Sequence, residues 1–328
     1  MGWQVRFASF SGFRGHHGAV KLPAANEPEQ GSSADGSGPN PEAQATALLV
    51  RCTVRACGGQ LKEEGAWGCD RGHRFDRARE GYVNLLQPQD SRSKHPGDPP
   101  ETVAARARVA ESGAEAALIE TVAGWVDTAR LPGGAAVLDV GCGTGELLAR
   151  LALQAELDAY GTDLTVRALR IAARRTPPPM GSLRWFASNA DRGLPFPDDA
   201  LDLVISIKAP KPTGEFARVL RPGGRALIAT PAIDDLIELR TQTAGGALAR
   251  DPAKAVLTAA QQAGLTLVSS LTVRTRRALP AELSLDLLMT GYRGLRRSER
   301  SRLPTDGTSL VTLATVLQVF EAPPKRED

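Results

Sequence analysis

The sequence predicts an α/β protein: a doubly wound, seven-stranded, mainly parallel sheet that follows a small N-terminal metal-binding module. Three observations lead to this prediction. Strand-like and helical apolar patterns alternate regularly from residue 136 onward. A glycine-rich turn at residues 141–145 follows one of these strands and opens a helix. Ahead of both, three cysteines and a histidine have the spacing of a tetrahedral metal site.

Composition limits the classes of protein to consider. The 328 residues allow two or three domains, and 42% apolar but only 5% aromatic residues predict a core of Ala, Val and Leu. No apolar run approaches the roughly 18–20 residues of a membrane span. Residues 1–20 also lack the apolar segment of a secretory signal. We therefore expect a cytoplasmic protein with no membrane partner, in which four cysteines favour metal binding over disulfides.

Composition shifts divide the chain into four segments. Residues 1–46 are polar and rich in Gly, Ser and Pro, so we expect a disordered extension. Residues 47–100 are predicted to form the metal-binding module and a connector, with a turn and short strand at 76–86 that closes the module. Residues 101–322 form the main domain, and 323–328 a disordered tail.

The main domain begins with one helix, predicted over 102–126 from its helical apolar spacing. The strands that follow are predicted at 136–140, 159–163, 183–187, 201–207, 225–230, 265–274 and 310–320. Helices are predicted at 145–154, 165–175, 214–219, 252–263 and 281–295. Helical crossovers between parallel strands cover both faces of a sheet, which is why we expect a doubly wound fold.

Cys52, Cys57, Cys69 and His73 are the predicted metal ligands. Thiolates and imidazole bind zinc tightly, and four protein ligands leave no open position, so the predicted role is structural. A module this short has little core and needs such a staple. The alternative is a metal-free module with three small apolar thiols and a solvent-facing histidine.

The glycine-rich turn is the predicted cofactor site. Glycines allow a positive φ and a close approach of the backbone to a ligand. Asp163 ends the next strand and is placed to accept hydrogen bonds from both ribose hydroxyls of a nucleoside, and Asn189 could face an adenine edge. Cys142 within the turn is interpreted as a small spacer. The expected cofactor-binding residues are Asp139, Gly141, Gly143, Gly145, Asp163 and Asn189.

From residue 137 to residue 231 these motifs resemble the class I S-adenosylmethionine-dependent methyltransferases, which have a Rossmann-like sheet. Over residues 48–322 the chain resembles, more narrowly, the zinc-containing 23S ribosomal RNA guanine-N1 methyltransferases, a family that includes enzymes protecting ribosomes from tylosin-like macrolides. The segments that carry this likeness are Gly72-His-Arg-Phe-Asp76, Glu80-Gly-Tyr-Val-Asn-Leu-Leu86, Pro96-Gly-Asp98 and Ala209-Pro210. The resemblance implies S-adenosylmethionine and structural zinc as cofactors, and methyl transfer to N1 of one guanine.

Two departures from the family bear on the substrate. The family usually carries Gly-His-Tyr in the helix that enters the main domain, where this chain has Gly113-Ala-Glu115. The loop after the fourth strand keeps Ala-Pro but has a lysine on each side, Lys208 and Lys211. We expect Lys208, Ala209 and Pro210 to orient the substrate, because the loop lies at the carboxyl edge of the sheet. Lys208 could stabilise an enolate-like O6 or simply contact a phosphate.

The implied partner is 23S rRNA or a hairpin of it, and a homodimer is left open. Phe75 and Tyr82 could stack on a base, although core packing is the simpler interpretation. Arginines gather around the cysteines and near the C-terminus, either as an RNA footprint or as ordinary solvated surface. They are Arg71, Arg74, Arg77, Arg79 and Arg92, then Arg274, Arg276, Arg277, Arg293, Arg296, Arg297, Arg300 and Arg302. Two alternatives stay open: a natural-product methyltransferase, and a non-catalytic RNA-binding protein that retains the fold.

Overall fold

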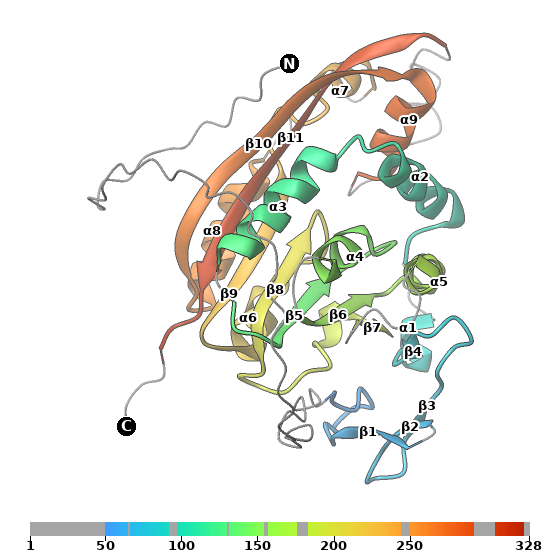
Figure 1. Cartoon of the computed structure of the whole chain (residues 1–328), viewed down its shortest axis with the longest axis vertical. Helices are drawn as coiled ribbons and strands as arrows, with labels where there is room; N and C mark the ends of the chain where they lie inside the picture. Colours follow the sequence, from blue (N-terminus) through green and yellow to red (C-terminus); the bar gives the residue numbers. More distant parts are fainter. Residues whose placement is uncertain are drawn as a thin grey trace, which may run out of the picture.

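A small three-stranded sheet and a large mixed sheet make up the part of the chain that the structure, a computed structural model, describes (Figure 1). That part comprises residues 50–64, 66–91, 97–129, 131–153, 157–175, 183–243, 250–291 and 306–324. The extension predicted at 1–46 lies outside it, and so do residues 325–328 of the predicted tail. Within these ranges no helix is long and apolar enough to cross a membrane.

The small sheet contains the strands β1 (Leu61–Glu64), β2 (Ala66–Cys69) and β3 (Arg74–Phe75), all antiparallel. Its central strand places Trp67 opposite Phe75 and brings Cys69 opposite Leu61. The Trp67 ring packs edge-on against Phe186 of the large sheet, with 5.6 Å between ring centroids. The module is therefore anchored to the main domain through apolar contact.

The large sheet has the strand order β10-β11-β9-β8-β5-β6-β7-β4. Its strands are β4 (Val83–Asn84), β5 (Ala135–Val140), β6 (Leu157–Asp163), β7 (Arg184–Ala187), β8 (Leu201–Ile207), β9 (Leu220–Pro231), β10 (Thr266–Pro280) and β11 (Thr308–Glu321). The strand β11 runs antiparallel to both of its neighbours, β9 and β10, and all the other neighbouring strands pair in parallel. The predicted doubly wound, mainly parallel sheet is confirmed, and β4 adds an eighth strand to the seven predicted.

The origin of β4 corrects one expectation. The short strand within 76–86 was expected to close the metal-binding module, but it pairs in parallel with β7, Val83 beside Phe186. Val83 is 4% exposed and belongs to the same apolar core as Phe186 and Trp67. Burial against the large sheet thus determined its pairing, which the local sequence could not reveal. The module is connected to the main sheet by this strand as well as by Trp67.

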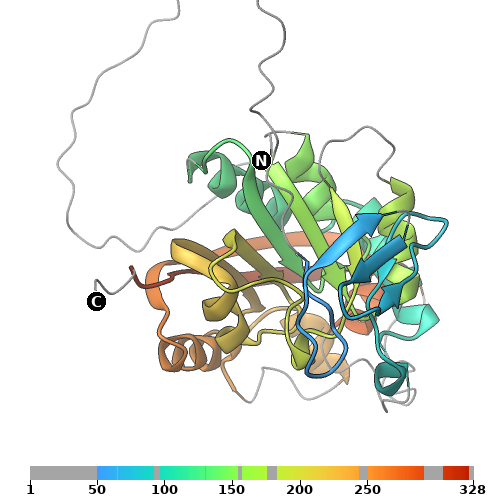
Figure 2. The same cartoon turned by 90° about the horizontal axis from the view of Figure 1, so that it is seen from below.

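Helices cover both faces of the large sheet (Figures 1 and 2). They are α1 (Pro88–Ser91), α2 (Pro100–Glu111), α3 (Ala116–Thr128), α4 (Glu146–Ala152), α5 (Val166–Arg175), the 3₁₀ turn η1 (Ala190–Arg192), α6 (Thr213–Val219), α7 (Ile237–Thr243), α8 (Pro252–Gln262) and α9 (Ala281–Met289). One core joins α3, α4 and α5 to the sheet, and a second joins α6 and α8 to its other face. Neighbouring residues of β5 enter opposite cores, Val137 one and Leu138 the other, so the strand is apolar throughout.

The helix predicted over 102–126 is two helices, which is a second correction. The chain leaves α2 at Glu111 and enters α3 at Ala116, and Gly113 between them has a φ of +62°. The Ser112 hydroxyl donates to the Val109 carbonyl and accepts from the Ala114 amide. A hydroxyl that bonds the backbone beside a left-handed glycine ends a helix. The helix α7 was not predicted.

Gly145, at the last position of the glycine-rich turn, gives the first testable prediction. Its φ is +84°, and a Cβ there would lie 2.7 Å from the Trp185 ring and 2.8 Å from the Ala172 Cβ. We expect Gly145→Ala to lower the free energy of unfolding by about 2–5 kcal/mol, from left-handed strain plus overpacking. Gly134→Ala is the matched control, since its φ is +72° with nothing within 4 Å, and it should cost only about 1–2 kcal/mol. Urea denaturation compares the two, and equal losses would refute the packing role.

Candidate cofactor and metal sites

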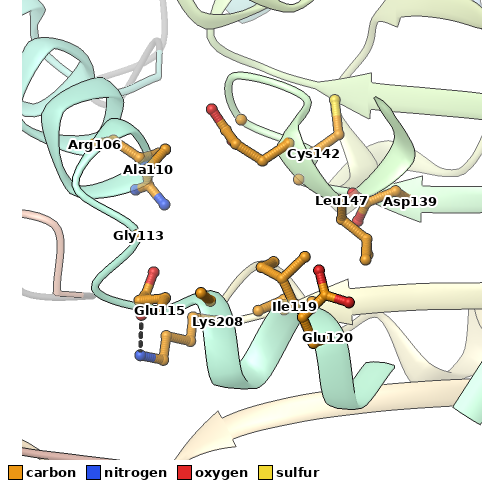
Figure 3. A pocket seen from close by; sticks show the side chains of 15 residues that line it. Arg106, Ala110, Gly113, Glu115, Ile119, Glu120, Asp139, Cys142, Leu147 and Lys208 are labelled. Carbon is orange, nitrogen blue, oxygen red and sulfur yellow. Dashed lines mark hydrogen bonds and ion pairs between the residues drawn. The ribbon is translucent and has the colours of Figure 1, made fainter. Parts of the chain in front are cut away.

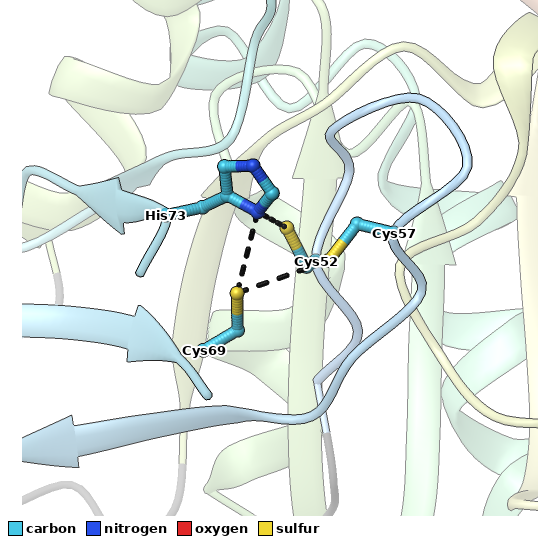
Figure 4. Close-up of side chains that lie close together, drawn as sticks. All are labelled: Cys52, Cys57, Cys69 and His73. Carbon is cyan, nitrogen blue, oxygen red and sulfur yellow. Dashed lines mark hydrogen bonds between the residues drawn. The ribbon is translucent and has the colours of Figure 1, made fainter. Parts of the chain in front are cut away.

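The predicted metal ligands lie together (Figure 4). Cys52 precedes the small sheet, Cys57 is in the loop before β1, Cys69 ends β2 and His73 leads into β3. Their ligand atoms all lie within 4.8 Å of one another. The Sγ–Sγ distance from Cys57 to Cys69 is 3.8 Å, and the His73 Nδ1 lies 3.5 Å and 3.4 Å from the Sγ atoms of Cys52 and Cys69. A tetrahedron with Zn–S and Zn–N bonds of ordinary length has edges of roughly 3.8 and 3.6 Å. The donor set and its geometry fit one zinc ion.

The surface around this cluster is basic. Arg71, Arg74 and Arg79 are exposed, and in the described part of the chain none of them forms an ion pair, whereas Arg77 pairs with Glu63 at 2.9 Å. The described C-terminal arginines differ: Arg274 pairs with Asp234 and Arg276 with Glu238, while Arg277 donates to the Gly113 carbonyl. Six of the arginines named from the sequence lie outside the described residues: Arg92, Arg293, Arg296, Arg297, Arg300 and Arg302. Of these two groups of arginines, the described members around the metal-binding module are therefore the ones that keep exposed, unpaired charges.

Phe75 and Tyr82 do not form a stacking surface. Each is 5% exposed, and each belongs to an apolar core. The suggestion that they stack on a base is wrong, and the simpler interpretation as core residues is confirmed.

The glycine-rich turn lies where the strand order reverses, between the carboxyl ends of β5 and β8. Ligands of open α/β sheets bind at this point, because diverging crossovers leave a crevice there. All three glycines have a positive φ: +73° at Gly141, +56° at Gly143 and +84° at Gly145. A cavity of about 260 Å³ opens beside the turn, lined among others by Asp139, Gly141 and Gly143 (Figure 3).

The glycines serve different contacts. A Cβ on Gly141 would lie 2.5 Å from the Cβ of Ala209, so this glycine lets the turn touch the loop after β8. A Cβ on Gly143 would meet the Arg106 side chain at 3.2 Å, at the cavity wall. Gly145 packs against α5 and β7, and it does not line the cavity. Only the first two thus shape the open space directly.

Asp163 braces the turn. One carboxylate oxygen accepts from the Gly143 amide at 2.9 Å, and the other accepts from the Thr165 amide at 2.7 Å. Burial raises the pKa of this carboxyl, and these two amides oppose that effect. Each oxygen keeps a further lone pair for a ligand hydroxyl.

Asp139 is the unusual group of the cavity. It is 4% exposed, and within the described residues its side chain accepts no hydrogen bond. Burial, together with the negative charges of Asp163 and Glu146, raises its pKa to about 8. A buried carboxylate without a partner is costly, and a nearby positive charge would lower that cost.

Comparison with known proteins identifies the chain. A methyltransferase domain model matches residues 137–224, and the RlmA N-terminal zinc-ribbon model matches residues 56–94. A putative 23S rRNA (guanine-N(1)-)-methyltransferase of Micromonospora griseorubida is 37% identical over 227 residues, 62% of this chain and 72% of that protein. The chain belongs to the RlmA family of methyltransferases. The predicted family, fold class and N-terminal zinc-binding module are thereby confirmed, and the module is a zinc ribbon.

Two further relatives are similar over shorter segments. The 23S rRNA (guanine(748)-N(1))-methyltransferase of Streptomyces fradiae is 42% identical over 179 residues, 52% of this chain and 59% of that protein. A putative 23S rRNA (guanine-N(1)-)-methyltransferase of Bacillus subtilis is 33% identical over 177 residues, 52% of this chain and 60% of that protein. The chain spans less than two thirds of the length of these two relatives.

Gly97 and Asp98 of this RlmA-family chain contact residues beside the glycine-rich turn. A Cβ on Gly97 would lie 2.8 Å from the Thr165 hydroxyl, and that hydroxyl accepts from the Asp98 amide at 3.0 Å. The Asp98 carboxylate pairs with Arg106 at 2.9 Å. Arg106 lines the cavity from α2, and its charge favours the ionised form of Asp163. The sequence did not single out Arg106, because only the folded chain brings α2 over the turn.

Asn189 lies just after β7, before η1, and its amide is already engaged. Its Nδ2 donates to the Asp90 carboxylate at 2.9 Å, and its Oδ1 accepts from the Asp191 amide at 3.1 Å. Asp90, in α1, is 3% exposed and also pairs with Arg192 at 2.7 Å. The connector thus holds the loop that carries Asn189. Asn189 and Asp163 do not line the 260 Å³ cavity, whereas Asp139, Gly141, Gly143 and Lys208 do.

The two departures from the family pattern meet in space. Lys208 Nζ lies 2.6 Å from the Glu115 carboxylate, and both side chains line the cavity opposite Asp139 and Cys142 (Figure 3). Burial disfavours the Lys208 charge, but Glu115 and Asp235 outweigh it and raise the pKa of Lys208. The pKa of Glu115 is lowered, chiefly by Lys208. Ala209 is buried against the glycine turn, and Pro210 is exposed.

Proposed function

We propose that the protein transfers a methyl group from S-adenosylmethionine to N1 of a guanine in 23S rRNA. The observation that carries the proposal is the cavity shared by the glycine-rich turn and the loop after β8, in a chain with an RlmA zinc ribbon. A donor on the turn side would face the groups on the Lys208 side. The two relatives with the highest identity above are named as a 23S rRNA (guanine(748)-N(1))-methyltransferase and a putative 23S rRNA (guanine-N(1)-)-methyltransferase.

The proposed donor site uses chemically matched groups. Asp163 would accept from the ribose hydroxyls, and Asn189 or its neighbours would meet the adenine. Gly141, Gly143 and Gly145 shape the turn, and Arg106 would pair with the carboxylate of the donor. Asp139 would face its positive charge. S-Adenosylmethionine supplies a methyl group that its sulfonium already activates, so the residues here bind and orient it.

The zinc ribbon is the proposed RNA-holding part. Cys52, Cys57, Cys69 and His73 would hold the metal in a closed, structural site. The exposed arginines around it would contact phosphates, which position an RNA without reading its sequence. The proposal places the protein in the cytoplasm with the ribosome. A homodimer stays a prediction, which sedimentation of the purified protein checks.

Asp139 gives a pH prediction for donor binding. Its pKa of about 8 means that most molecules carry a neutral carboxyl at pH 7, whereas a cationic ligand favours the ionised form. Binding should then release a proton below pH 8, and affinity should rise up to about tenfold per pH unit from pH 6 to 8 and level off above. Calorimetry in two buffers of different ionisation enthalpy measures the proton release. Affinity that is independent of pH would contradict the role of Asp139.

Reverse transcription tests the proposed reaction in cells. A methyl group on guanine N1 blocks pairing, so it stops primer extension. A stop that is present in 23S rRNA of the parent strain and lost in a deletion strain supports the proposal. An unchanged stop pattern refutes it, and methylation of a small natural product by the purified protein would establish the alternative. RNA binding without methyl transfer would establish the other alternative, a non-catalytic RNA-binding protein.

A further inference from the structure

The break between α2 and α3 and the loop after β8 bring together two residues 93 positions apart in the chain. Glu115 immediately precedes α3, where the left-handed Gly113 redirects the chain into the cavity. Lys208 follows β8 and has a φ of +51°, a conformation that a lysine rarely adopts. Its amide donates to the Ala229 carbonyl at 2.9 Å, which holds the strained residue in place. Lys208 thus has a strained backbone conformation at the carboxyl edge of the sheet, in the wall of the cavity. Such strain is typical of functional residues.

The two side chains are only partly covered. Lys208 is 23% exposed and Glu115 32% exposed, so a ligand in the cavity can reach both. Arg106 and the buried Asp235 are the other charged groups that act on Lys208. Asp235 already accepts from the Ala314 amide at 2.8 Å. Glu115 is thus the acid beside Lys208 that also lines the cavity.

The hydrogen-bonding groups of Lys208 and Glu115 are complementary to the pairing edge of one particular base. An ammonium only donates, and an ionised carboxylate only accepts, through two oxygens. Guanine presents an acceptor, O6, directly beside two donors, N1–H and N2–H. Adenine presents the reverse order at N6 and N1, and uracil presents a second acceptor where guanine has N2–H. A donor beside a two-oxygen acceptor therefore fits guanine along its whole pairing edge.

We propose that Lys208 and Glu115 are catalytic residues that bind the pairing edge of the target guanine, Lys208 at O6 and Glu115 at N1–H and N2–H. This proposal rests on the proposed function. In the reaction the N1–H bond breaks and the proton passes to a Glu115 oxygen. Lys208 stabilises the negative charge that spreads to O6. The N1 electron pair then bonds to the methyl carbon as the carbon–sulfur bond breaks and leaves its pair on sulfur. The products are 1-methylguanine, S-adenosylhomocysteine and a protonated Glu115 that loses its proton to solvent.

The arrangement explains how a carboxylate with a low pKa can accept this proton. In the free protein Lys208 holds the pKa of Glu115 below its ordinary value. When Lys208 turns to O6, Glu115 loses part of that stabilisation and becomes a better base. At the same time the ammonium makes N1–H more acidic. The base thus becomes active when the right substrate is bound.

The test compares Glu115→Gln, Lys208→Met and the double variant with the wild type and the control Glu321→Gln. Glu321 pairs with Arg225 at 3.5 Å on the sheet, away from the cavity. Single-turnover methyl transfer to 23S rRNA should fall about 100-fold or more in each single variant. The double variant should be no slower than the slower single variant, because the two groups act as a unit. It also removes both members of the pair, so neither Glu115 nor Lys208 is left as an unpaired charge, and it stays folded if a single variant does not.

Two readouts exclude a merely structural role. The rate of Glu115→Gln should rise about tenfold per pH unit above pH 7, because hydroxide replaces the missing base. The second readout is binding of the rRNA segment that contains the target nucleotide, measured with S-adenosylhomocysteine present. The wild type should bind this segment more weakly when inosine replaces the target guanosine. Glu115→Gln should discriminate less between the two forms, because inosine lacks only N2–H and the amide keeps one accepting oxygen where the carboxylate has two.

Three results would overturn the proposal. One is single-turnover rates within threefold of the wild type. Another is a Lys208→Met variant that loses donor affinity but keeps its rate at saturation, since Lys208 would then hold the carboxylate of the donor. The third is guanosine–inosine discrimination that Glu115→Gln retains in full. A wild type that itself transfers no methyl group to 23S rRNA refutes the proposed function instead, so the two failures are distinct.

Discussion

Replacing Cys69 by serine should remove the zinc and, with it, methyl transfer to rRNA. Structural zinc sites of this kind contribute about 10–16 kcal/mol of apparent binding free energy, and serine is a poor substitute for a thiolate. Strands of four, four and two residues are too short to form a stable sheet without the bound metal. The arginines around the cluster would lose their fixed positions, and we expect rRNA methylation to fall about 100-fold or more.

Metal analysis of the purified protein is the primary readout. The wild type should carry one zinc per chain and Cys69→Ser close to none. Cys142→Ser is the matched control, because Cys142 is a buried thiol in the cofactor turn, outside the cluster. It should keep its zinc. A Cys69→Ser variant with a full equivalent of tightly bound zinc would show that these four residues are not the ligand set.

Replacing Asp139 by asparagine should make the protein more stable and its donor binding weaker. Its carboxyl has a pKa of about 8 in the folded chain, well above the ordinary value of 3.8. Between these values the folded state binds a proton that the unfolded state has released, so stability falls as pH rises. Asparagine has no ionisable side chain, so this fall in stability with rising pH should be absent in the variant. We expect a gain of about 1–3 kcal/mol near pH 8 and little gain near pH 4.

Donor affinity should change in the opposite direction. Without the carboxylate, a cationic ligand loses a charge-assisted contact in a buried site, about a 10- to 100-fold loss of affinity. The dependence of binding on pH should also disappear. Urea denaturation at pH 4 and pH 8, with calorimetric titration, measures both properties. A variant that is less stable at pH 8, or that binds the donor as tightly as the wild type, would contradict this account of the cavity.

Features set by local pattern were predictable. The glycines follow β5, and Asp139 and Asp163 lie near the carboxyl ends of β5 and β6, which meet at one edge of the sheet. The spacing of the cysteines and His73 likewise sufficed to predict the cluster.

Features set by distant contacts were not predictable. The pairing of β4 with β7 depends on where Val83 is buried, and Arg106 reaches the turn only after α2 packs over it. Glu115 and Lys208 each stood out as a departure from the family, but 93 residues separate them and nothing local shows that they touch. The Ser-Gly pair before residue 114 did indicate the break between α2 and α3. The helical spacing of apolar residues on both sides of it nevertheless favoured a single helix.

The most direct measurement is the identity of the methylated nucleoside. Purified protein is incubated with S-adenosylmethionine and unmodified 23S rRNA, and the RNA is digested and analysed by mass spectrometry. The account predicts 1-methylguanosine, about one per rRNA molecule at completion, and none without the protein. Methylation of any other nucleoside, or none by a protein that holds zinc and binds the donor, would contradict it.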